Sequence, residues 1–122
     1  MDEPAAPAPA GGLRGLLDRQ VALIEAGDLD GLLGQYHDDA ELLRFDMVVR
    51  GRDELRAFFA GYLALEPRLE RLDAYAETSD LLSYQATMAT RNGLLRTYGV
   101  MLVRDGRIAR QAAGVFPSPS PV

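Results

Sequence analysis

The chain has 122 residues and a formal net charge of −5, and all 13 of its basic residues are arginines spread along the sequence. This length predicts one domain with one hydrophobic core. The acidic balance and the scattered arginines argue against a nucleic-acid surface, which concentrates positive charge. The chain contains no cysteine and no lysine. Thiolate metal sites, cysteine nucleophiles and lysine Schiff bases are therefore excluded.

The two ends of the chain are rich in proline and small residues. Residues 1–12 and 117–122 cannot bury enough apolar surface to offset the entropy cost of ordering, so we expect disordered tails around one domain at 13–116. No apolar run approaches the ~20 residues of a membrane span, and the N-terminus lacks the order of a secretion signal. We expect a cytoplasmic protein without membrane contact.

Helical spacing dominates the first half of the domain. A stripe of apolar residues begins at Leu13 and stops at Gly27, and Asp28 can cap a second, short helix. A third helix must end before Pro67. The elements expected from these signals are helices from 13 to Gly27, at 29–36 and from about 52 to before Pro67, with a short strand pair at 40–45 and 47–49 between the last two.

From Arg68 onward the apolar period changes to two, which predicts strands at 68–78, 81–90, 95–104 and 107–116. Asn92-Gly93 and Asp105-Gly106 are strong hairpin turns. Helices followed by an antiparallel meander indicate the α+β class. Residues 97–103 are largely apolar on both faces, so the outer face of this strand needs a cover. A second copy of the chain is the simplest cover, which predicts a homodimer.

Four short segments carry a resemblance to a known family: residues 26–31 (AGDLDG), 36–40 (YHDDA), 51–55 (GRDEL) and the pair Phe58-Phe59. With them the chain resembles the SnoaL-like branch of the nuclear-transport-factor-like superfamily, which also holds ketosteroid isomerases and limonene epoxide hydrolases. The resemblance covers 13–116. It implies a cone-shaped α+β barrel, in which three N-terminal helices pack in a curved, mainly antiparallel sheet around a cavity. This fold hosts many chemistries, so function depends on the pocket.

The ketosteroid-isomerase pattern also implies which residues face that cavity. They are Gln20, Tyr36, Arg44, Phe59, Tyr84, Met88, Gly99 and Gln111, with Asp46 on the face of Arg44. The chain departs from the isomerase at its reactive positions. Gln20 stands at the phenol position, Arg44 at the general-base position and Gly99 at the second acid. The acidic position of epoxide hydrolases and SnoaL cyclases falls near Gln111 and Ala113, so none of these reactions is implied.

Asp46 is the remaining carboxylate for proton transfer, because an apolar cone raises the pKa of a carboxyl group toward the working range. Arg44 opposes that rise and would stabilise an enolate or bind a carboxylate. The alternative is a structural ion pair at the rim, or a solvated turn at Asp46. Tyr84 lies on the apolar face of its strand, where it either donates to a substrate carbonyl or is a core tyrosine bonded to backbone.

The other candidates have supporting roles. Gln20 and Gln111 are neutral groups that can orient a polar ligand atom, Tyr36 can orient a neighbour, and Phe59 and Met88 belong to the apolar wall. The single histidine, His37, is expected to stabilise the end of the second helix. Neither a metal-ligand spacing nor a phosphate-binding glycine loop is present in the sequence, so we expect no cofactor.

Two functional hypotheses follow. The first is a cofactor-independent enzyme of isomerase, cyclase or lyase type that acts on a small, mainly apolar carbonyl compound, with Asp46, Arg44 and Tyr84 as catalytic residues. The second is a non-catalytic binding or dimerisation module of the same fold. A carboxylate on the cavity wall favours the first, and a cavity closed by side chains favours the second.

Overall fold

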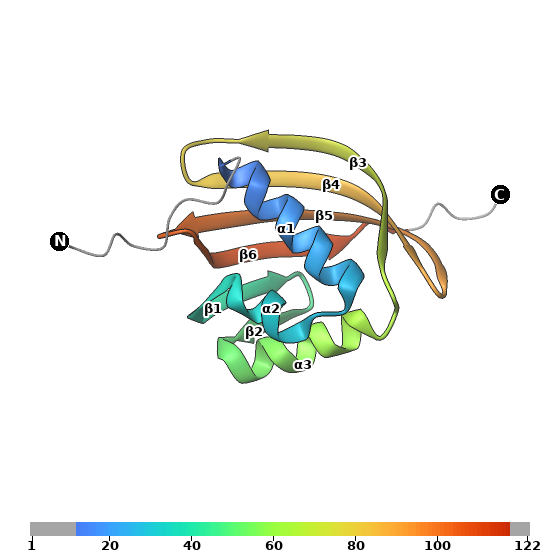
Figure 1. The fold of residues 1–122 in the computed structure, drawn as a ribbon, viewed down its shortest axis with the longest axis horizontal. Helices are drawn as coiled ribbons and strands as arrows, with labels where there is room; N and C mark the ends of the chain where they lie inside the picture. The colour runs from blue at the N-terminus through green and yellow to red at the C-terminus, as the bar shows by residue number, and fades with distance from the viewer. Residues whose placement is uncertain (1–11, 118–122) are drawn as a thin grey trace.

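The computed structural model describes residues 12–117, which form three helices and one sheet of six strands (Figure 1). In chain order the elements are α1 (Gly12–Ala26), α2 (Leu29–Gly34), β1 (Tyr36–Arg44), β2 (Met47–Arg50), α3 (Gly51–Leu63), β3 (Arg68–Glu77), β4 (Leu81–Thr90), β5 (Gly93–Arg104) and β6 (Arg107–Val115). Of the expected tails, residues 1–11 and 118–122 lie outside the described part. Within that part, no helix is both long and apolar enough to cross a membrane.

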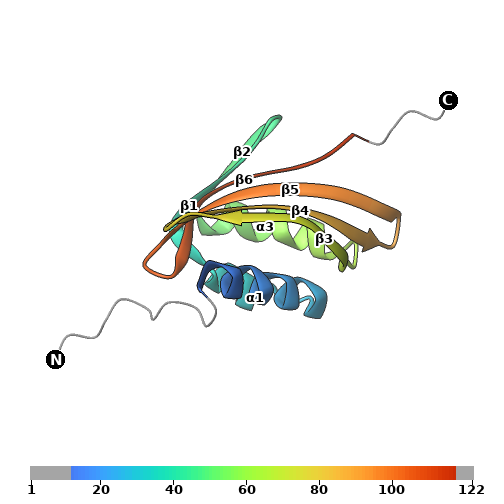
Figure 2. The same ribbon diagram turned by 90° about the horizontal axis from the view of Figure 1, so that it is seen from above.

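The strands lie in the order β2-β1-β6-β5-β4-β3, and every neighbouring pair is antiparallel except β1 and β6. The sheet curves without closing, and the helices lie on its concave face (Figure 2). Seen from above, no helix covers the opposite face within residues 12–117. The α+β class and the curved, mainly antiparallel sheet are confirmed.

Local signals explain the helix boundaries. Gly27 ends α1 at a positive φ of 67°, which a residue with a side chain adopts only with strain. The Asp28 carboxylate then accepts a hydrogen bond from the Gly31 amide at 2.9 Å and caps α2. These two residues turn the chain between two helices, as the sequence predicts.

The second helix is shorter than predicted, and this changes the placement of two residues. It ends at Gly34, the Gln35 carbonyl accepts the Ile108 amide at 2.8 Å, and Tyr36 begins β1. The expectation that His37 stabilises a helix end is therefore wrong. His37 is a strand residue, and its Nε2 lies 2.6 Å from the Arg104 carbonyl. Pairing with β6 decides this boundary, because the register brings Tyr36 opposite Ile108.

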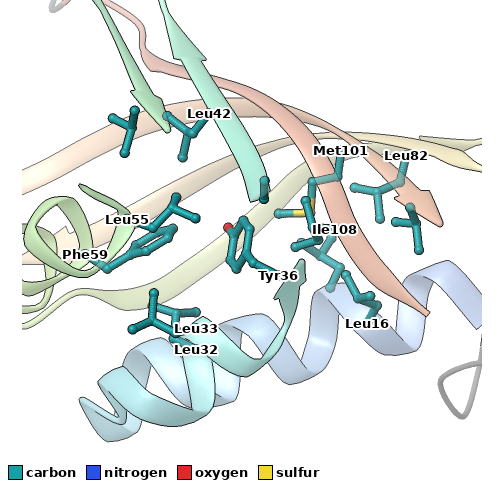
Figure 3. Packing of buried hydrophobic residues seen from close by; sticks show 14 of the residues in the cluster. Leu16, Leu32, Leu33, Tyr36, Leu42, Leu55, Phe59, Leu82, Met101 and Ile108 are labelled. Carbon is teal, nitrogen blue, oxygen red and sulfur yellow. The ribbon is translucent and has the colours of Figure 1, made fainter. Parts of the chain in front are cut away.

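The core fills the space between the helices and the concave face. Tyr36 lies at its centre, with Leu55 and Phe59 on one side and Met101 and Ile108 on the other (Figure 3). The outer face of the sheet carries exposed apolar side chains instead. These are Leu43, Val48, Leu81 and Val100, each between 39% and 55% exposed.

Candidate ligand-binding pocket

A cavity of about 120 Å³ lies between α1, α3 and the concave face of the sheet. An apolar cavity of ~150 Å³ binds benzene, so the volume of this space is close to that of one small ring. Most of its wall is apolar. The wall residues are Leu17, Val21 and Ile24 of α1, Phe58, Phe59 and Tyr62 of α3, and Leu42, Leu69, Leu72, Ala86, Met88, Thr97, Ala113 and Gly114 of the strands, with Tyr98 and the four polar groups described below.

Small residues create this hollow in the sheet. Strand alternation directs Tyr84, Gly99 and Ala113 to the concave face, where they stand opposite one another in one row across β4, β5 and β6. The Tyr84 ring lies across Gly99, because a Cβ atom at position 99 would come within 2.5 Å of the Tyr84 hydroxyl. Gly99 therefore admits the Tyr84 ring, and Ala113 leaves the space beside it open.

One side of the cavity carries buried polar groups, Gln20 of α1 and Gln111 of β6. The Gln20 Nε2 donates to the Tyr36 hydroxyl at 2.9 Å, and Tyr36 in turn donates to the Gln111 Oε1. Tyr36 is 1% exposed and does not itself line the cavity. It joins the two glutamines from behind and holds both amides in place.

Tyr84 and Tyr36 are neutral at ordinary pH. Burial raises the pKa of Tyr84 to about 12, and the nearby Gln111 side chain opposes the rise. Burial also raises the pKa of Tyr36 well above its usual value, to which the nearby Tyr84 adds and which the Gln20 hydrogen bond opposes. Phenols held in the neutral form can donate hydrogen bonds to a ligand but cannot act as bases.

Arg44 lines the pocket at the last position of β1, two residues after Leu42 on the same face. Its guanidinium lies over the Phe58 ring, 5.8 Å from the centroid. Arg44 Nε is the buried side-chain nitrogen that lacks a hydrogen-bond partner among residues 12–117. A buried N–H group of a cation is costly to leave unpaired, so this end of the cavity favours an anionic or strongly accepting oxygen.

Asp46 lies outside the cavity wall, in the turn between β1 and β2. Its side chain is 56% exposed, and its Oδ1 lies 3.6 Å from Arg44 Nε, within range of an ion pair but too far for a hydrogen bond. Asp46 is thus next to Arg44 of the pocket wall and within reach of solvent.

The structure brings most of the predicted residues together. Gln20, Arg44, Phe59, Tyr84, Met88 and Gln111 line one cavity. Tyr36 lies behind it, Gly99 under Tyr84, and Asp46 beside Arg44. Sequence reasoning missed Gln35 and Arg19, which continue the polar groups away from the cavity. The Gln35 Nε2 donates to the Gln20 Oε1 at 3.2 Å and the Arg19 Nη1 to the Gln35 Oε1 at 3.2 Å.

Fold and pocket together are those of a small conical α+β domain with a cavity between its helices and its sheet. The model of the SnoaL-like domain matches residues 17–111, and the chain belongs to that family. This confirms the resemblance seen in the sequence. No curated protein sequence gives a significant match.

Solved structures share the fold at low sequence identity. The chain is similar to a putative ketosteroid isomerase from Kribbella flavida, with a TM-score of 0.76, 13% identity, and 89% of this chain and 81% of that one covered. The epoxide hydrolase/cyclase-like enzyme SalBIII of salinomycin pyran ring formation gives a TM-score of 0.75 at 12% identity, covering 84% and 89%. A putative polyketide cyclase from Sinorhizobium meliloti gives 0.70 at 18%, covering 81% and 93%.

Proposed function

We propose that this protein is a cofactor-independent enzyme of isomerase, cyclase or lyase type that acts on a small, mainly apolar carbonyl compound. The observation that carries the proposal is the buried Nε of Arg44, which lacks a hydrogen-bond partner among residues 12–117 and lies on the wall of a mostly apolar cavity. A ligand with an enolate or carboxylate oxygen at Arg44 would accept a hydrogen bond from its Nε. The apolar body of the same ligand would lie over Ala113 and contact the apolar part of the wall. The names of the similar cyclase and isomerase structures agree with this class of reaction.

Each catalytic candidate has a separate role. Arg44 stabilises negative charge that develops on the substrate oxygen, and Tyr84 donates a hydrogen bond to a carbonyl. Asp46 takes the proton from the carbon next to that carbonyl, after its carboxylate turns from solvent toward the cavity. Arg44 keeps Asp46 near the site through their 3.6 Å contact.

Exchange of hydrogen for deuterium at the α-carbons of cyclohexanone, followed by NMR in D₂O, tests this proposal. The wild type should accelerate exchange, and Asp46→Asn should lower the catalysed rate by roughly 100-fold or more while cyclohexanone still binds. Asp105→Asn makes the same change in another turn and should leave the rate unchanged. An equal rate in Asp46→Asn and the wild type would remove Asp46 from the mechanism.

A second function, a non-catalytic ligand-binding module, is favoured by one observation. The cavity wall, as formed by residues 12–117, contains no carboxylate and no histidine. In this case cyclohexanone and cyclohexanecarboxylate would bind without any accelerated exchange. Arg44→Met should weaken carboxylate binding in either case, and Arg50→Met, on the outer face, should not.

We propose further that a second copy of the chain covers the outer sheet face, over Leu43, Val48 and Val100. This face combines exposed apolar side chains with an edge of paired charges, in which Glu41 contacts Arg50 at 3.0 Å. A patch of this kind is typical of a protein interface. In this arrangement the second copy leaves the concave face and its cavity free.

A further inference from the structure

A chain of buried side-chain hydrogen bonds runs from the protein surface to the cavity. It passes from Arg19 through Gln35, Gln20 and Tyr36 to Gln111. Gln20, Gln35 and Gln111 are each at most 6% exposed, and they come from α1, the end of α2 and β6. Glutamine amides can point either way, so the direction of each bond has to be argued from fixed partners.

Two partners fix the direction at Gln35. The Leu16 carbonyl can only accept, and the Gln35 Nε2 donates to it at 3.0 Å. The Arg19 guanidinium can only donate, and it meets the Gln35 Oε1 at 3.2 Å. Both constraints require the same orientation of the Gln35 amide. Its position is also held by the main chain, because the Gln35 carbonyl accepts from Ile108 of β6.

The orientation of Gln35 determines every bond that follows. Its Nε2 also donates to the Gln20 Oε1, so the Gln20 Nε2 faces Tyr36 and donates to its hydroxyl. Tyr36 must then donate its own proton onward, and the Gln111 Oε1 receives it. The Gln111 amide N–H groups are left as donors at the cavity wall, which Gln111 and Tyr84 share. In every hydrogen bond of this chain, the donor lies on the side of the protein surface and the acceptor on the side of the cavity.

We propose that this one-way chain makes the inner end of the cavity a hydrogen-bond donor, so that the substrate places a carbonyl oxygen beside Gln111 and Tyr84, and that Gln35 is the positioning residue that sets the direction. The inference rests on the proposed function and deepens it by naming the substrate class. The Arg44 guanidinium can also only donate hydrogen bonds. Both polar ends of the cavity therefore offer hydrogen-bond donors. The substrate class is therefore a small apolar compound with two accepting oxygens, a carbonyl at Tyr84 and an anionic oxygen at Arg44.

Gln35→Glu tests the direction. A carboxylate at position 35 cannot donate, so Gln20 must turn its Nε2 toward it, Tyr36 must donate to the Gln20 Oε1, and Gln111 must donate to Tyr36. The Gln111 Oε1 then faces the cavity, where it repels a carbonyl oxygen and can accept a hydrogen bond from the Tyr84 hydroxyl. The new charge lies beside Arg19, which limits the cost of burying it. Gln85→Glu adds the same charge at an exposed position of β4 and serves as the matched control.

The experiment compares binding of cyclohexanone with that of methylenecyclohexane, an isostere without an accepting oxygen, by amide chemical-shift titration. The wild type and Gln85→Glu should bind the ketone about 3- to 10-fold more tightly, the range expected for one neutral hydrogen bond. Gln35→Glu should bring this ratio close to 1, while methylenecyclohexane binds as in the wild type. Gln35→Met, which removes the anchor without adding charge, should lower the ratio as well and decides the matter if Gln35→Glu fails to fold.

The outcomes separate this inference from the proposed function. Equal binding of the two probes by the wild type, or an unchanged ratio in the folded Gln35 variants, overturns the one-way chain and leaves the proposed function in place. If neither probe shifts the amide signals of the cavity residues, both the inference and the proposed function are overturned. A ratio lost only in the Gln35 variants supports the inference, because a purely structural role would weaken both probes together.

Discussion

Removing the hydroxyl of Tyr36 should destabilise the protein while leaving its packing intact. Tyr36→Phe keeps the ring against Phe59, whose centroid lies 5.3 Å away. It breaks two buried hydrogen bonds, one from Gln20 and one to Gln111. Each buried polar group left without a partner costs about 1–3 kcal/mol. Gln111 lines the cavity and can regain a water, so we expect a loss of about 2–4 kcal/mol in the free energy of unfolding.

Urea unfolding followed by circular dichroism measures this loss. A domain of this size has a total stability of roughly 5–15 kcal/mol, so the variant should remain folded, with a lower midpoint and an unchanged m-value. Tyr75→Phe is the matched control. Its hydroxyl donates to the exposed Glu77, and its loss should cost no more than about 0.5 kcal/mol. A Tyr36→Phe variant within 0.5 kcal/mol of the wild type would refute the reasoning.

Two further predictions concern pH and assembly. Tyr84 titrates near pH 10 when unfolded and near 12 when folded, so the unfolded chain loses this proton first and stability should fall from about pH 10 to 12, by up to about 1.4 kcal/mol per pH unit. Urea unfolding at pH 9.5 and 11.5 checks this, and Tyr84→Phe should fall less steeply; equal slopes would contradict it. The wild type should sediment at about twice the 13.3 kDa chain mass, and Val100→Arg should sediment at the monomer mass. Leu94→Arg, at the start of β5, should leave the dimer unchanged. A monomeric wild type would end the dimer proposal.

The fold could be predicted from the sequence where local chemistry decides it. Gly27 and Asp28 require a turn between helices in any context, and the alternation at 82, 84, 86 and 88 assigns one face of β4. The start of β1 could not be predicted in this way. Tyr36 begins that strand because it pairs with Ile108, more than 70 residues later, and no local pattern reports such a contact.

The candidate site shows the same difference between residues placed by local sequence and residues placed by distant contacts. Residues placed by strand alternation, such as Tyr84 and Gln111, reach the cavity as expected. The two-residue spacing from Arg44 to Asp46 does not extend the alternation, because β1 ends at Arg44 and the chain turns. No sequence pattern indicated roles for Gln35 and Arg19. Their roles depend on a contact between the end of α2 and α1, which joins residues 16 positions apart.

A buried polar chain needs a reason beyond stability, because apolar side chains of similar shape stabilise a core equally well. The combination Gln20→Met, Tyr36→Phe and Gln111→Met removes three members of the chain together, and Gln35 keeps its bonds to the Leu16 carbonyl and to Arg19. We expect it to recover most of the stability lost in Tyr36→Phe alone. It should not recover the preference for cyclohexanone over methylenecyclohexane, because the cavity no longer has the directed amide donor of Gln111. Stability and preference returning together would show that the chain serves packing alone, and their separation would show that it orients the ligand.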